Sequence, residues 1–364
     1  MIEKRPTACL GLMSGTSLDG VDGALIITDG ETIQGFGPSH YRPYSDVERQ
    51  ELQKVLGRWQ DDDGFEIAEE IVLSAHFDVV QKFAEAEIVG FHGQTLAHDP
   101  EGGRTHQLGN GWTLAQMVEK PVVWDFRTAD VAAGGQGAPL APFFHFACAK
   151  ALGTRSPIAF LNLGGVGNVS FVDPSRNRPE ADGALLAFDT GPANAPLSDF
   201  MQARFGKTMD EDGALAAQGK PDGNVLERLL KLPYFEAQPP KSLDRDHFAQ
   251  LQDEVKDLSD ADAAATLTAV IVSTVYAAQM HFPADPIRWL VCGGGRHNKT
   301  LMNGLAQALD QPVAPVEAVG FDGDMFEAQA FGYLAMRVLR ELPLSAPGTT
   351  GCKEPVLGGQ VSKL

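Results

Sequence analysis

The sequence predicts an α/β protein assembled from two similar halves, because one local pattern occurs twice. In each copy, two short apolar runs flank a glycine-rich polar loop, and apolar runs bounded by turn residues are typical of strands. The first pair of runs is Ala8–Met13 and Gly23–Ile27, and the second pair is Ile158–Leu163 and Val169–Val172. Two later apolar runs, Ala184–Phe188 and Arg288–Cys292, also lead into polar loops. The repeated strand–loop–strand unit indicates a duplicated α/β core.

Composition limits the classes of protein to which the chain can belong. A length of 364 residues predicts two domains with an ample core. The 29 basic and 48 acidic residues give a net charge of −19, which argues against nucleic acid or an anionic membrane as a partner. No uninterrupted apolar run reaches membrane-spanning length, the N-terminus lacks a signal-peptide pattern, and the four cysteines show neither C-x-x-C nor zinc spacing. We therefore expect a protein of the reducing cytoplasm.

The first polar loop is Ser14-Gly15-Thr16-Ser17-Leu18-Asp19-Gly20-Val21-Asp22. Glycines let the backbone approach a ligand, and successive N–H groups in such a turn form an anion-binding concavity to which the hydroxyls add donors. Asp19 and Asp22 would repel a bare phosphate, so they predict Mg²⁺ between carboxylate and phosphate. The loop is not a P-loop, because no lysine follows it. A plain hairpin turn with solvated acids is the alternative interpretation.

The predicted strand Ile88–Phe91 leads into His92, Gln94 and Thr95. This is where α/β folds place groups that contact ligands, outside the carboxyl ends of strands. A core-edge histidine satisfied by the backbone remains an equal explanation of His92. Metal binding by this region is not expected, because its histidines share no helical ligand spacing.

Arg127 lies between Asp125 and Asp130 after another predicted strand. It could form a structural ion pair with either acid or bind a substrate carboxylate bidentately, through two guanidinium nitrogens. The glycine- and proline-rich stretch 134–142 then marks a boundary. We therefore expect an N-terminal lobe over 1–137, a C-terminal lobe over 138–340, and a tail over 341–364 that packs back on the N-terminal lobe.

The second half repeats the glycine loop at Gly164, Gly165, Gly167 and Asn168. Asp189 follows the run Ala184–Phe188, and Gly293, Gly294 and Gly295 follow the run Arg288–Cys292. One glycine triplet is weak evidence for a site. Four polar loops that each follow a buried strand are stronger together, and they indicate a nucleotide held between the two halves.

Several longer motifs resemble those of one family. They are GLMSGTSLDGVDGAL (11–25), GFHGQT (90–95), DFRTADVAAGGQGAPLAP (125–142), NLGGVGN (162–168), FDTGPAN (188–194), QPPKS (238–242), CGGGRHN (292–298) and EAQAFGYLA (327–335). The chain resembles the anhydro-N-acetylmuramic acid kinase family, within the actin, hexokinase and heat-shock chaperone ATPase superfamily. It departs from the family pattern at Ala193, at Leu243-Asp244 and at Ser198-Asp199-Phe200. The resemblance implies a two-lobed, duplicated ribonuclease-H-like α/β fold with an active-site cleft between the lobes.

The resemblance also implies an activity and its residues. The expected enzyme uses ATP and Mg²⁺ to open 1,6-anhydro-N-acetylmuramic acid with water and to phosphorylate O6, as part of peptidoglycan recycling in the cytoplasm, and it is expected to be a homodimer. Asp189 matches the catalytic base, and the three glycine loops match the nucleotide site. The Ser14–Asp22 loop is expected to hold the β- and γ-phosphates with Mg²⁺, which Asp19 and Asp22 would bind through water. The expected substrate contacts are His92, Gln94, Thr95, Arg127, Asp130 and Glu327. Two alternatives are another small-molecule kinase of the superfamily and a non-enzymatic protein switched by ATP.

Overall fold

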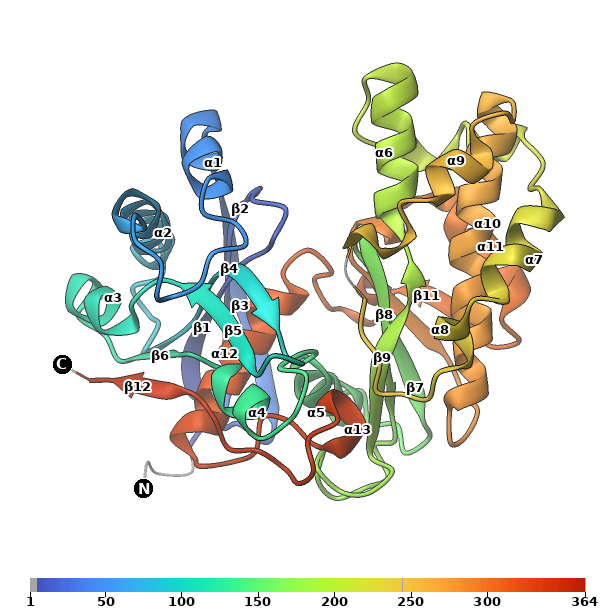
Figure 1. The fold of residues 1–364 in the computed structure, drawn as a ribbon. Helices are drawn as coiled ribbons and strands as arrows, with labels where there is room; N and C mark the ends of the chain where they lie inside the picture. The colour runs from blue at the N-terminus through green and yellow to red at the C-terminus, as the bar shows by residue number, and fades with distance from the viewer. Residues whose placement is uncertain (1–4, 244, 364) are drawn as a thin grey trace. The chain divides into compact units, whose positions relative to one another are not determined.

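The computed structural model describes residues 5–243 and 245–363, which form two compact units (Figure 1). The first unit contains the described residues up to Gly153, the segment Arg178–Glu180 and the described residues from Met325 onward. The second contains Thr154–Asn177 and the described residues from Ala181 to Asp324. Residues 138–153 and 325–340, which we expected in the C-terminal lobe, thus group with the first unit.

The first unit is built on a seven-stranded sheet in the order β12-β6-β4-β1-β2-β3, with β5 paired to β4. The strands are β1 (Thr7–Ser14), β2 (Gly20–Thr28), β3 (Ile33–Pro43), β4 (Ile88–Asp99), β5 (Arg104–Leu108), β6 (Val122–Trp124) and β12 (Gln360–Ser362). The first three strands are antiparallel, and β4 and β6 run parallel to β1. The tail strand β12, red in Figure 1, pairs antiparallel with β6.

Helices cover both faces of this first sheet. The buried helix α12 (Phe326–Leu339) approaches so closely that a Cβ on Gly11 would lie 1.7 Å from the carbonyl oxygen of Ala328. On the other face, a Cβ on Gly23 would lie 2.3 Å from Val79 of α2 (Glu66–Val80). The unit is completed by α1 (Asp46–Gln53), α3 (Gly111–Val118), α4 (Thr128–Ala132), α5 (Pro142–Ala151) and α13 (Pro347–Thr350). This contact with the sheet explains why α12 belongs to the first unit.

The second unit contains a five-stranded sheet in the order β11-β10-β7-β8-β9. Its strands are β7 (Ile158–Leu163), β8 (Val166–Val172), β9 (Leu185–Pro192), β10 (Trp289–Cys292) and β11 (Val313–Pro315). The first three are antiparallel, and β10 and β11 run parallel to β7. Strands β3-β2-β1-β4-β6 of the first unit have the same order and directions. The predicted duplicated α/β fold is therefore confirmed.

The helices of the second unit are α6 (Asn194–Phe205), α7 (Gly223–Leu230), α8 (Pro233–Glu236), α9 (Leu251–Val255), α10 (Asp260–Ala278) and α11 (Lys299–Ala308). Residues of α10 and α11 form a core with the sheet, and a second core joins α6 to α10. By length and hydropathy the stretch Asp260–His281 could cross a membrane, a possibility that the search for uninterrupted apolar runs missed. Because 61% of its apolar 18-residue window is buried within the protein, as in a core helix, it is weak evidence for a membrane span.

Candidate active site

The loop between β1 and β2 is held by its two apolar residues. Leu18 and Val21 are buried in the core of the first unit, whereas Thr16, Ser17 and Asp19 are exposed. Leu18 has a positive φ of 57°, and its N–H donates to the carbonyl of Gly15 at 3.1 Å, which closes a tight turn. The apolar side chains thus anchor the turn, and the exposed hydroxyls remain on its outer side.

Hydrogen bonds of the buried Ser14 and Gln94 hold this loop in place. The Ser14 hydroxyl lies 2.6 Å from Gln94 Oε1, 3.0 Å from the carbonyl of Gly20 and 3.1 Å from the Tyr44 hydroxyl. The amide of Gln94 also donates to the carbonyl of Gly15 at 3.0 Å. Both side chains are at most 1% exposed. Ser14 and Gln94 therefore join the loop to β4, and their polar groups are engaged within the protein rather than presented to a ligand.

The two carboxylates of the loop share one neighbour, Tyr41 on β3. Asp22 pairs with Tyr41 in the sheet register, and the Tyr41 hydroxyl donates to the carbonyl of Asp19 at 2.8 Å. Burial raises the pKa of Tyr41, and the negative charges of Asp19 and Asp22 add to this shift. Within the described residues, no three acidic, histidine or cysteine side chains form a metal cage. Two carboxylates nevertheless fit Mg²⁺, which takes its remaining ligands from phosphates and water.

The buried His92, within β4, and the half-buried Arg127, which follows β6, form a hydrogen-bonded pair. Arg127 donates from Nε to His92 Nε2 at 3.1 Å and from Nη1 to the carbonyl of Gly137 at 2.7 Å. Burial lowers the pKa of Arg127 to about 10, and burial together with the Arg127 charge holds the pKa of His92 well below its usual range. His92 is thus satisfied by its neighbours, and its imidazole orients the guanidinium. The strand β4 continues through these residues to Asp99 instead of ending at Phe91.

The acids that flank Arg127 do not pair with it. Asp125 accepts hydrogen bonds from Thr128 (2.5 Å) and Gln360 (2.8 Å). Asp130 is buried and accepts hydrogen bonds from the N–H of Gly137 and from the hydroxyls of Ser345 and Thr350. In the described part of the chain, no carboxylate lies within ion-pair distance of Arg127. The structural ion pair is therefore wrong, and Asp130 instead ties the C-terminal tail to the first unit.

Glu327 and Thr95 are the remaining predicted substrate contacts. Glu327 lies in the first turn of α12, where its side chain is exposed to solvent. The dense surrounding protein raises the pKa of its carboxyl group, whereas the charge of Arg127 lowers it. Thr95 is half-buried, and its hydroxyl accepts a hydrogen bond from Gln107 at 3.3 Å. The charges of Glu327 and Arg127 thus interact. Thr95 lies on β4, directly after Gln94.

In the second unit, Asp189 lies within β9 rather than beyond it. Its backbone is held by Lys241 and Tyr234, since its N–H donates to the Lys241 carbonyl (2.9 Å) and its carbonyl accepts from the Tyr234 hydroxyl (2.5 Å). The described residues give its carboxylate one hydrogen bond, from the N–H of Leu243 to Oδ2 at 2.8 Å. Burial raises the pKa of Asp189 to about 7, although the Leu243 bond opposes the shift. The segment 238–243 therefore positions a carboxylate that can take up a proton near neutral pH.

The two glycine loops of the second unit lie beside Asp189. Asn168 on β8 is its partner in the sheet register. The carbonyls of Gly164 and Gly165 accept hydrogen bonds from the N–H groups of Asn194 (2.9 Å) and Ala193 (3.1 Å), where α6 begins. Gly293 has a φ of 74°, and a Cβ there would lie 2.3 Å from Asn162 Oδ1, so only glycine fits this turn. The ends of β7, β9 and β10 thus bring the two glycine loops of the second unit close to Asp189.

Two sets of residues at this site escaped the sequence analysis. Arg296 is buried, pairs with Glu317 (2.8 Å) and Asp324 (2.9 Å), and donates to the carbonyl of Gly293. Tyr44 contacts Ser14 of the first loop. Tyr234 and Lys241 hold the backbone of Asp189. The motif QPPKS pointed to Lys241, but only the register of the structure could show which strand it contacts. Of the departures from the family pattern, Ala193 and Phe200 are buried apolar residues, and Asp244 lies outside the described residues.

Comparison with known protein families assigns the chain to one of them. The sequence profile of the anhydro-N-acetylmuramic acid kinase family matches residues 7–363. The anhydro-N-acetylmuramic acid kinase of Cereibacter sphaeroides is 58% identical over 97% of this chain and 95% of its own length. The enzyme of the same name from Roseobacter denitrificans is 57% identical over 98% of this chain and 94% of its own.

Among solved structures, the activator of the 2-hydroxyisocaproyl-CoA dehydratase from Clostridium difficile, with bound ADPNP, covers 92% of this chain and 96% of its own. It is 11% identical, and its TM-score of 0.47 is too low to add to the fold assignment. The assignment rests on the family match, which spans nearly the whole chain, and on relatives that share more than half of its residues. This chain belongs to the anhydro-N-acetylmuramic acid kinase family.

Proposed function

We propose that the chain is an ATP-dependent anhydro-N-acetylmuramic acid kinase. Water opens the 1,6-anhydro bridge at C1, and O6 receives the γ-phosphoryl group of ATP, so the product is N-acetylmuramic acid 6-phosphate. Family membership supports the activity. The observation that supports the mechanism is the carboxylate of Asp189, which has a pKa of about 7 and one hydrogen-bond donor among the described residues.

Asp189 is suited to act as the general base. An effective base has a pKa near the working pH, because it is then ionised and still takes up a proton readily. Asp189 would accept a proton from the water that attacks C1, as the base does in inverting glycoside hydrolysis. Leu243 N–H would hold Oδ2 in place and leave the other oxygen for the water. Departure of O6 needs no separate general acid, because its developing charge is taken up by the phosphoryl group.

The glycine loops would bind the nucleotide. In the first unit, the N–H groups and exposed hydroxyls of the Ser14–Asp22 loop would bind the β- and γ-phosphates, while Ser14 and Gln94 keep its shape. Asp19 and Asp22 would hold Mg²⁺, which would neutralise charge on the phosphates. In the second unit, Gly164–Asn168 and Gly293–Gly295 would contact phosphate and adenosine. These assignments follow from exposure and backbone geometry, and Arg296 would keep the Gly293 turn in place.

Arg127 would bind the lactyl carboxylate of the sugar. Nε and Nη1 of Arg127 are engaged by His92 and Gly137, so Nη2 remains for a ligand. Glu327 would act beside Arg127 on the same substrate. We assign His92 a supporting part, since both of its nitrogens are engaged within the protein. We further propose that Thr95 contacts the substrate. As the resemblance to the family implies, we also propose that the protein is a homodimer, is located in the cytoplasm and takes part in peptidoglycan recycling.

The reaction can be tested by mass spectrometry of the product formed with ATP in ¹⁸O-labelled water. The proposal requires one ¹⁸O at C1 and none in the new phosphate group. Label in the phosphate would mean that water attacks phosphorus, which contradicts the coupled mechanism. A phosphorylated product without label would identify a kinase that acts on an intact hydroxyl group instead.

A further inference from the structure

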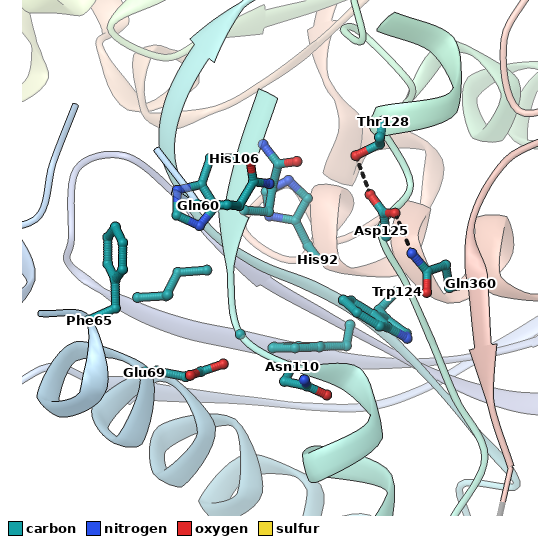
Figure 2. Close-up of a pocket in the computed structure, with 14 residues that line it drawn as sticks. Gln60, Phe65, Glu69, His92, His106, Asn110, Trp124, Asp125, Thr128 and Gln360 are labelled. Carbon is teal, nitrogen blue, oxygen red and sulfur yellow. Dashed lines mark hydrogen bonds between the residues drawn. The ribbon is translucent and has the colours of Figure 1, made fainter. Parts of the chain in front are cut away.

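A cavity of about 420 Å³ lies in the first unit, on the side of β4 and β6 that α2 and α3 cover (Figure 2). Its apolar lining consists of Phe65, Leu108 and Trp124, together with Phe91, which is only 1% exposed. Its polar wall includes Gln60, Glu69, Gln107, Asn110, Asp125 and Gln360. The volume lies in the range of small-molecule sites, and an apolar wall with a few convergent polar groups is the usual composition of such sites. None of the nucleotide loops contributes to it.

The polar groups of this cavity mostly accept hydrogen bonds. Gln60 and Gln360 each donate one amide N–H within the protein, to the carbonyl of Thr105 and to Asp125, and Gln107 donates to Thr95 and Thr105. Their three Oε1 atoms and the carboxylate of Glu69 receive no hydrogen bond from the residues that the structure describes. Among the lining side chains, Asn110 offers its amide nitrogen as a donor, because its oxygen caps α3. The cavity thus suits a ligand with several donors.

The charges of the lining exclude an anion. Glu69 and Asp125 are acidic, and no lysine or arginine lines the cavity. His92, which also lines it, is neutral because burial and Arg127 hold its pKa well below the usual range. A phosphate or carboxylate ligand would face two acidic side chains with no lysine or arginine beside them. This distinguishes the cavity from the Arg127 group and from the phosphate loops.

The walls are held rigidly, as expected of a preformed site. Figure 2 shows Asp125 between Thr128 and Gln360, which both donate to it. Asp125 also has a φ of 55°, a left-handed conformation that is uncommon for a residue other than glycine and is concentrated at functional sites. The indole of Trp124 donates to Ser362 of β12 at 3.1 Å and packs on Gly111, where a Cβ would lie 2.2 Å from the ring. The aromatic wall therefore keeps its orientation without a ligand.

We propose that this cavity binds a neutral pyranose sugar. The apolar C–H face of such a ring can pack on the aromatic wall, and its hydroxyls can donate to Glu69 and to the amide oxygens of Gln60, Gln107 and Gln360. The inference does not rest on the kinase reaction, because apart from His92, which supports Arg127, the lining residues have no part in the proposed mechanism. It gives the first unit a second sugar site, separated from Arg127 by the imidazole of His92.

The test is a titration followed by NMR of the tryptophan indole N–H signals, assigned with Trp124→Phe, in the absence of ATP. The probes are methyl β-D-glucopyranoside, the cation putrescine and inorganic phosphate. We expect the glucopyranoside to shift the Trp124 signal saturably. Glu69→Ala should weaken this binding about tenfold, because a hydrogen bond to a charged group is lost. Glu66→Ala is the matched control, since it removes the same charge from the first turn of α2 outside the cavity.

A second variant, Gln360→Ala, removes an acceptor from a different element and should weaken binding about threefold. Melting temperatures of both variants show that the protein is folded. The proposal is overturned if the glucopyranoside leaves the Trp124 signal unchanged, or if Glu69→Ala and Glu66→Ala bind it equally well. Saturable shifts with putrescine or phosphate alone would overturn it too, and would assign the cavity to a charged ligand.

Discussion

Arg127 donates a hydrogen bond from Nε to Nε2 of His92 at 3.1 Å, and this contact determines the protonation of both side chains. A guanidinium can only donate, so the imidazole accepts at Nε2 and carries its proton on Nδ1, where it donates to the carbonyl of Gly93 at 2.8 Å. His92 is thus neutral, and its ring position is set by β4. The orientation of the one guanidinium nitrogen left for a substrate is set in turn by His92.

The first prediction concerns Arg127→Lys. Lysine keeps the charge but has no planar fork, so it cannot reach His92, Gly137 and a substrate carboxylate together. We expect KM for the anhydro sugar to rise about tenfold to a hundredfold, with little change in KM for ATP. Steady-state kinetics measure both constants. Arg228→Lys, in an exposed ion pair with Glu254, is the control. An unchanged sugar KM with a lower melting temperature would instead assign Arg127 a purely structural part.

The second prediction concerns Asp189→Asn, which keeps the shape of the side chain and removes the proton acceptor. General-base loss lowers kcat by about 10² to 10⁴, and the affinity for ATP should barely change. The exposed Asp182→Asn, from the segment that precedes β9, is the control. Titration with Mg²⁺ provides a second readout. Recovery of kcat at high Mg²⁺ would mean that Asp189 is a metal ligand and not the base.

The third prediction is the pH dependence of the wild-type rate. The carboxyl group of Asp189 has its pKa raised to about 7, and the base is active only when ionised. The value of kcat should therefore be constant above this pH and fall about tenfold for each unit below it. A profile that stays flat down to pH values near the ordinary carboxyl pKa of about 4 would contradict the assignment.

The fourth prediction concerns Gln94→Leu. The substitution leaves the Ser14 hydroxyl and the Gly15 carbonyl without their buried partner, so the first glycine loop should lose its fixed shape. We expect KM for ATP to rise about tenfold, while KM for the sugar changes less. Gln252→Leu removes a comparable bond to the Pro196 carbonyl in the second unit and serves as the control. A larger rise in KM for the sugar than in KM for ATP would instead identify Gln94 as a substrate contact.

The fifth prediction concerns stability in acid. Burial lowers the pKa of His76 to about 4, since its ring is enclosed by α2 and Phe91 and one nitrogen lacks a partner. The unfolded chain takes up a proton near pH 6.5 and the folded chain only near 4. Stability is therefore lost as pH falls through this window, by about 3 kcal/mol from this residue. His76→Met should flatten the dependence in chemical denaturation, whereas the exposed His297→Met should not.

The sequence predicted the architecture well, but it predicted poorly which partners individual polar side chains have. The two glycine hairpins show the duplication because strand length and turn residues are local properties. Whether a polar side chain is available to a ligand depends on which residues it contacts inside the protein. These residues are often distant in the sequence. Gln94 and Asp130 stand in motifs that resemble substrate sites, yet Ser14, Ser345 and Thr350 occupy their polar groups. The grouping of residues 325–340 with the first unit is not evident from the sequence for a related reason, since the apolar stripe of α12 does not tell which sheet it covers.

The way in which the first unit is assembled has a consequence for synthesis. Its sheet is covered by α12 and completed by β12, while nearly all of Thr154–Asp324 belongs to the other unit. A nascent chain can therefore finish the second unit while the first still lacks one side of its core. Until the last strand leaves the ribosome, β6 has an open edge, and the glycine surface around Gly11 and Gly90 has no helix against it. Ribosome-bound chains halted once Asp324 has left the exit tunnel should accordingly resist protease in the second unit and be cut in the first.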